Sequence, residues 1–230
     1  MRGLLCALPL VGLVIGAFGC LYGLLSELLQ LSPILSAAVL TLLPVALSGG
    51  IHMDGFADTT DALSSYAPPE KKRAILKDPH TGAFAIIGVA CYLLLYFGLC
   101  AALPLRREWT LLLGLTHVLS RVVGALSSVL LPGSTQEGTL HMFRDAATKH
   151  SAWILFVWAA VTLAAMALLS WLAAAISALA GLCVFLYLKY MSAKQFNGMS
   201  GDLAGWCIMV TAIVLLLGLV VAERVTTLWF

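Results

Sequence analysis

Charged residues are scarce in this sequence, and their scarcity decides the class of protein. They make up 10% of the 230 residues, against 61% hydrophobic residues, and the mean hydropathy is +1.01. A soluble domain carries about 25% charged residues, so the composition excludes a soluble globular protein and indicates a protein embedded in a lipid bilayer. The net charge is only +2, and no basic stripe with interleaved aromatic residues is present, which excludes nucleic acid as a partner.

Other familiar patterns are missing as well. The six cysteines lie in apolar surroundings and none belongs to a Cys-x-x-Cys pair, which argues against a zinc site or a disulfide framework. The sequence has no internal repeat, no low-complexity tract and no linker that would separate two domains. We therefore expect a single integral-membrane domain over residues 1–230. The sequence leaves its oligomeric state open, a homo-oligomer included.

Long apolar runs divide the chain into predicted transmembrane helices, each of which needs about 20 apolar residues. The runs cover residues 4–25, 83–103, 109–131 and 203–222, and residues 152–188 are long enough for two spans joined near Ser170. Residues 34–47 supply only fourteen residues, so this span is complete only if its helix continues into the polar segment that follows or is partly re-entrant. The prediction is an all-α polytopic bundle of about seven spans, with six or eight as alternatives.

Basic residues are distributed unevenly over the predicted loops. With seven spans, nine of them fall on the side that holds the amino terminus and three on the other side. Positive charge favours the cytoplasmic side of a membrane, so we expect the first side to face the cytoplasm. The nine are Arg2, Lys71, Lys72, Arg73, Lys77, Arg144, Lys149, Lys189 and Lys194, and the three are Arg106, Arg107 and Arg224.

Aspartate is concentrated in one segment. Three of the six aspartates, Asp54, Asp58 and Asp61, have the spacing i, i+4 and i+7, which places them on one face of a helix. Their carboxylates repel one another unless a cation lies between them, and oxygen ligands of this kind suit Mg²⁺ that holds a substrate phosphate. The alternative interpretation is a solvated polar loop beside the membrane. The spacing favours the Mg²⁺ site.

Two further polar features need an explanation. Arg121 lies inside the span at 109–131, on a stripe of small and polar residues that includes His117, and an intramembrane charge costs about 2.5–3.5 kcal/mol on insertion scales. It should face the bundle interior, either as the ion-pair partner of an aspartate or as a contact for an anionic substrate group. The segment NGMSGD at residues 197–202 precedes the last span, and its glycines allow close approach or positive φ beside phosphate oxygens.

These polar segments resemble the motifs of a known enzyme family. GGIHMDGFADTTD at residues 49–61, ILKDPHTGAF at 75–84 and GMSGDLAG at 198–205 are similar to motifs of the cobalamin synthase family. The similarity in length and hydropathy covers the whole chain, and the informative motifs cover about forty residues. Pro79 and His80 stand where the family pattern has serine and arginine.

The resemblance implies a reaction. Adenosylcobinamide-GDP and α-ribazole, or its 5′-phosphate, combine to give adenosylcobalamin, or its 5′-phosphate, with release of GMP. Such a transfer from a pyrophosphate to a ribose hydroxyl needs charge neutralisation and in-line positioning more than covalent catalysis, and Mg²⁺ is the expected cofactor. The resemblance also implies the bacterial cytoplasmic (inner) membrane, and the distribution of basic residues predicts that the active face lies toward the cytoplasm.

The candidate site residues have three expected roles. The sequence does not identify which aspartate accepts the hydroxyl proton. The candidate catalytic residues are Asp54, Asp58, Lys77 and Asp78; the substrate-binding residues are His52, Arg121, Asn197, Gly201 and Asp202; and the Mg²⁺ ligands are Asp54, Asp58 and Asp61.

Two other classes remain open from the residues alone. A membrane prenyl- or phosphatidyl-transferase also holds Mg²⁺–pyrophosphate with aspartates on helices, but such families pair two Asp-rich motifs or place an arginine soon after the Asp-Gly. A transporter would line a path with Arg121 and the aspartates. It would be expected to show repeats in its two halves, and the sequence shows none.

Overall fold

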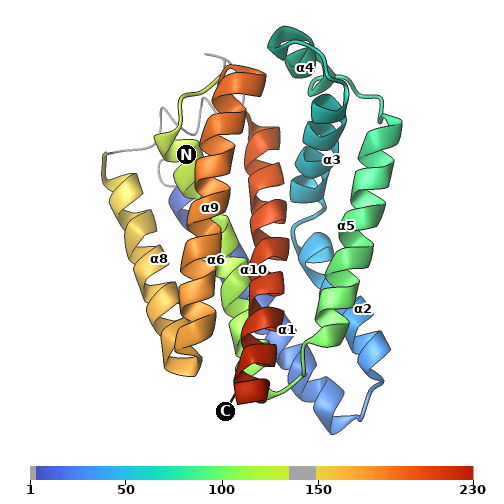
Figure 1. Cartoon of the computed structure of the whole chain (residues 1–230), viewed down its shortest axis with the longest axis vertical. Coiled ribbons are helices and arrows are strands. Elements are labelled where there is room, and N and C mark those ends of the chain that lie inside the picture. Colours follow the sequence, from blue (N-terminus) through green and yellow to red (C-terminus); the bar gives the residue numbers. More distant parts are fainter. Residues whose placement is uncertain (1–3, 135–148, 230) are drawn as a thin grey trace.

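Helices account for nearly the whole of the structure. The computed structural model describes residues 4–134 and 149–229, whose helices pack side by side in one bundle (Figure 1). Extended pairing in these ranges is limited to one isolated bridge between Gly133 and Met199. The all-α prediction is confirmed, whereas Arg2 and most of the loop with Arg144 lie outside the described residues. The described helices are α1 (Leu4–Leu28), α2 (Pro33–Leu47), α3 (Ile51–Ser64), α4 (Pro69–Ile75), α5 (Ala83–Ala102), α6 (Arg107–Leu130), α8 (Lys149–Leu169), α9 (Trp171–Phe196) and α10 (Gly201–Trp229).

Six of the described helices are long and apolar enough to cross a membrane, namely α1, α5, α6, α8, α9 and α10. The two spans predicted within residues 152–188 are α8 and α9. They join at Ser170, whose side chain caps α9 by accepting a hydrogen bond from the Ala173 N–H at 3.2 Å. α2 and α3 are long and apolar enough to cross a membrane only when they are taken together, and their axes are bent by 92° relative to each other. Counted as one broken span, this pair brings the total to seven, in agreement with the prediction.

The bend between α2 and α3 follows from two consecutive glycines. Gly49 and Gly50 have φ angles of 64° and 77°, a left-handed conformation that glycine adopts without the strain that a Cβ brings. Their backbone N–H groups donate to the Ala46 and Val45 carbonyl oxygens at 3.2 and 3.0 Å, so the polar groups at the break are partly paired within the chain. The short apolar run is therefore a half-span, and the helix changes direction before it reaches the aspartates.

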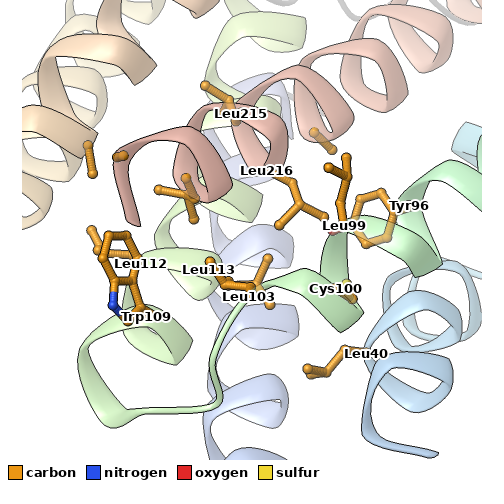
Figure 2. Packing of buried hydrophobic residues seen from close by; sticks show 14 of the residues in the cluster. Leu40, Tyr96, Leu99, Cys100, Leu103, Trp109, Leu112, Leu113, Leu215 and Leu216 are labelled. Carbon is orange, nitrogen blue, oxygen red and sulfur yellow. The ribbon is translucent and has the colours of Figure 1, made fainter. Parts of the chain in front are cut away.

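The largest hydrophobic cluster lies between α2, α5, α6 and α10. Figure 2 shows Leu40 of α2, Tyr96 of α5, Leu112 of α6 and Leu216 of α10 among the buried side chains that meet there. Most of α6 is buried, so it is a central helix of the bundle. On the outer surface, Leu94 of α5 is 71% exposed, as expected for a side chain that faces lipid tails.

The polar segments gather at one end of the bundle. α4, the start of α5, the end of α9 and the start of α10 lie together at the upper end in Figure 1, while the end of α10 lies at the opposite end. The predicted common side of these loops is thus confirmed for the described residues. Three hydrogen bonds dock α4 on its neighbours: Lys72 Nζ donates to Gln195 Oε1 at 2.6 Å, Asn197 Nδ2 to Glu70 Oε1 at 3.2 Å, and Arg73 Nη1 to the Ser134 carbonyl oxygen at 3.3 Å.

Candidate active site

α3 carries the three clustered aspartates on one helical face, as their spacing predicts. The residues from Ile51 to Ser64 are helical, so Asp54, Asp58 and Asp61 follow one another at about one turn. Asp54 is exposed, and Asp58 and Asp61 are half-buried. Within the described ranges, none of the three forms an ion pair with a basic side chain. This face of α3 therefore carries uncompensated negative charge.

A close crossing of α3 and α10 brings a fourth aspartate to this face. A Cβ added at Gly55 would lie 2.8 Å from the carbonyl oxygen of Asp202, and one added at Gly205 would lie 3.2 Å from that of His52. The two helices therefore touch through their backbones, as small residues at a helix interface allow. Ser200 Oγ donates to Asp202 Oδ2 at 3.4 Å, which orients this carboxylate at the start of α10.

Four carboxylates thus form the candidate active site, called the acidic site below: Asp54, Asp58 and Asp61 of α3, and Asp202 of α10. Asp58 lies within electrostatic range of the other three, and Asp202 lies within range of Asp54. In the part of the chain that the structure describes, no three His, Cys, Asp or Glu side chains converge closely enough to hold a metal ion by themselves. Mg²⁺, however, usually keeps several waters and is held by one or two carboxylates together with substrate phosphates. Carboxylates without basic partners fit an ion that binds in this way, together with a phosphorylated substrate.

The loop between α4 and α5 carries Lys77 and Asp78, both of which are exposed. Asp78 Oδ1 accepts a hydrogen bond from the backbone N–H of His80 at 2.9 Å and contacts the Nδ1 of its ring at 2.7 Å. These contacts, the backbone hydrogen bond first, hold the pKa of Asp78 below its ordinary value, so this carboxylate is ionised at neutral pH. Gly82, at the end of the loop, lies against the Asp61 side chain and joins the loop to the acidic site.

Arg121 is buried inside the bundle, as predicted for the small-and-polar stripe of α6. It is 2% exposed, and its Nη1 lies 3.0 Å from Ser120 Oγ and 3.3 Å from His117 Nδ1, while its Nε has no partner. Among the described residues no carboxylate lies within 4.0 Å of it, so the structure does not support the ion-pair interpretation. It lines a small interior pocket together with Thr41, Pro44, Val45, Tyr92, Tyr96, His117, Met209 and Ala212.

The remaining predicted residues lie in different settings. His52 is half-buried in the first turn of α3 and lies within electrostatic range of Arg121. Gly201 is exposed and has open space where a Cβ would be. The expected need for glycine applies instead to Gly198, which has a φ of 131° and packs on the Gly133 backbone. Asn197 caps α9 and donates to Glu70, so its visible contacts serve the docking of α4.

Sequence reasoning missed the residues that hold these side chains in place. The crossing glycines Gly55 and Gly205 and the contact of Gly82 with Asp61 were not predicted. One signal was available for the crossing, because Gly201 and Gly205 have the Gly-x-x-x-Gly spacing that is common where membrane helices meet.

Fold and site together define a polytopic, all-helical membrane protein with a carboxylate site at one end of its bundle. The chain belongs to the family described as cobalamin-5-phosphate synthase, which matches residues 1–220. The resemblance seen in the sequence motifs is thereby confirmed.

Individual relatives carry a consistent name. A protein of Lachnoclostridium phytofermentans named adenosylcobinamide-GDP ribazoletransferase is 38% identical over 226 residues, which cover 98% of this chain and 86% of the relative. Proteins of the same name from Desulfitobacterium hafniense and Pseudomonas putida are each 34% identical, over 91% and 92% of this chain and 83% and 84% of their own lengths. No solved structure matches the chain significantly.

Proposed function

We propose that this protein is an adenosylcobinamide-GDP ribazoletransferase of the bacterial inner membrane. It would join adenosylcobinamide-GDP to α-ribazole, or its 5′-phosphate, and release GMP. The observation that carries the proposal is the acidic site, four carboxylates from two helices without a basic partner in the described part of the chain. Membership of the family and the names of the relatives supply the substrates.

The proposed chemistry needs no covalent intermediate. An oxygen of the ribazole ribose attacks the phosphorus next to the cobinamide, the new P–O bond forms, the bond to the bridging oxygen breaks, and GMP leaves with that oxygen. The hydroxyl proton passes to a carboxylate of the acidic site. Mg²⁺ would be held by one or two of the carboxylates of Asp54, Asp58 and Asp61 together with the substrate phosphates, and would neutralise the pyrophosphate charge. Lys77 adds a positive charge from the adjoining loop, and Arg121 and His52 are proposed to contact an anionic or acceptor group of the substrate.

GMP release tests this function directly. Protein purified in detergent should release GMP from adenosylcobinamide-GDP only when α-ribazole or its 5′-phosphate is present. Release should depend on Mg²⁺. Inactivity on this pair, together with activity on an isoprenoid pyrophosphate or a CDP-alcohol, would instead support a prenyl- or phosphatidyl-transferase. Transport of the corrinoid without GMP release would support a transporter.

The acidic site is proposed to face the cytoplasm, because the basic residues gather at its end of the bundle. In a background without the exposed Cys91 and Cys183, a Glu70→Cys variant should react with a membrane-impermeant maleimide only after the cells are opened. A Leu228→Cys variant at the other end of the bundle should react in intact cells if the α2–α3 pair crosses as one span. Labelling of position 70 from outside intact cells would contradict the orientation.

A further inference from the structure

We propose that Gly82 is a positioning residue for Asp61, and that the absence of a side chain at position 82 lets the Asp61 carboxylate lie against the start of α5. The inference rests on the proposed function for its effect on catalysis, but the contact itself does not. Gly82 is the N-cap residue of α5. It also ends the loop that carries Lys77 and Asp78, so the contact links that loop to the acidic site.

The contact depends on the small size of Gly82 and not on the backbone conformation of this residue. Gly82 has a φ of −79° and a ψ of 166°, an extended conformation that any residue adopts. A Cβ built on it would collide with both carboxylate oxygens and the Cγ of Asp61. The Asp61 side chain therefore fills the volume that a methyl group at position 82 would occupy.

The start of α5 also suits a carboxylate. The first N–H groups of a helix have no partner within the helix, and its N-terminal end favours negative charge. Among the described residues no hydrogen bond holds the Asp61 carboxylate, so its position depends on this packing. Asp61 in turn is within electrostatic range of Asp58, which ties the contact to the rest of the acidic site.

A methyl group at position 82 should therefore displace the carboxylate and leave the fold intact. The atoms in its way are the end of a flexible side chain, which can rotate to another rotamer at small cost. Misplacement of a catalytic group by about 1 Å lowers rates by up to about 100-fold. We expect Gly82→Ala to lower GMP release by at least about 10-fold, with an unchanged yield of folded protein.

Gly98→Ala is the matched control, because Gly98 lies in the same helix and has nothing within 4 Å of a built Cβ. The two alanine variants are compared in the wild-type background and in an Asp61→Ala background. Besides GMP release, hydrogen exchange of the first turn of α5 is measured in chelator, where neither metal nor substrate contributes. With Asp61 present, Gly82→Ala should raise the exchange rate of these amides about 3-fold or more relative to Gly98→Ala, because the displaced carboxylate no longer stabilises the helix end. Without Asp61, the difference between the two variants should shrink to the part that an N-cap Gly→Ala change causes by itself.

Two results would overturn the inference. One is equal exchange and equal GMP release for Gly82→Ala and Gly98→Ala in the wild-type background. The other is an effect of Gly82→Ala that persists at full size without Asp61, which would show that the glycine serves a different neighbour. If Gly82→Ala raises amide exchange only when Asp61 is present, but the protein releases no GMP, the contact is supported and only the proposed function is refuted.

Discussion

Replacement of Asp58 by asparagine should lower the rate of GMP release by at least about 100-fold, the scale of losing one key electrostatic group. The same loss is expected for Asp54→Asn and Asp61→Asn. Asparagine keeps the size of the side chain and one oxygen ligand but removes the negative charge that is proposed to hold Mg²⁺ against the substrate pyrophosphate. The measurement is GMP release by purified protein at saturating concentrations of both substrates.

Two further observations make this result specific. Insertion into the membrane should be unchanged, because neutral asparagine is no harder to insert than aspartate. Part of the loss at Asp58 or Asp61 should be recovered at high Mg²⁺, since the remaining carboxylates still offer a weakened site. Glu108→Gln, which removes an exposed carboxylate at the start of α6, should retain full activity. Full activity in chelator, or three silent asparagine variants, would mean that this face of α3 is merely a solvated surface.

Replacement of Arg121 should separate activity from stability. Burial of an ion is costly unless the ion is paired, and this guanidinium has an unpartnered Nε and no carboxylate within 4.0 Å in the described ranges. Arg121→Met removes the free-energy cost of burying this charge, and it leaves no carboxylate without its partner. We therefore expect a higher thermal unfolding temperature. If the guanidinium contacts an anionic substrate group as proposed, turnover should also fall by at least about 100-fold.

The lysine variant tests the geometry of the same contact. Arg121→Lys keeps the charge but loses the planar fork of donors, so turnover should fall while the yield of folded protein stays nearly unchanged. Arg107→Lys, an exposed position at the start of the same helix, is the control and should be silent. Loss of folded protein in the Arg121→Met and Arg121→Lys variants would show instead that the arginine supports the bundle and has no role in substrate binding.

Hydropathy predicted the membrane-spanning helices well because lipid imposes one simple requirement on each of them. The ends of α5 and α6 follow directly from where the apolar runs stop, and Ser170 was recognisable as the turn between two spans. α9, in contrast, continues past the apolar run that ends at residue 188 and reaches Phe196. The i, i+4, i+7 spacing likewise predicted the shared face of Asp54, Asp58 and Asp61, since it depends only on local helix geometry.

The remaining features depend on contacts between distant segments, which periodicity does not encode. Gly55 and Gly205 are separated by 150 positions in the sequence, and nothing in either segment identifies the other as its partner. The 92° bend after α2 could not be predicted, because a short apolar run fits a continued helix and a re-entrant segment equally well. The role of Arg121 could not be decided from the sequence either. The described structure has no carboxylate near it, which argues against the ion-pair interpretation.

The crossing of α3 with α10 also determines when, during synthesis of the protein, the acidic site can be assembled. A ribosome completes α3 well before α10, so the first three carboxylates are made long before the fourth. Throughout that interval the nascent protein has no α10 backbone for Gly55 to pack against. A chain released before residue 201 would carry Asp54, Asp58 and Asp61 on a helix without its main neighbour and without the fourth carboxylate. The acidic site is therefore completed in a single event, the docking of α10.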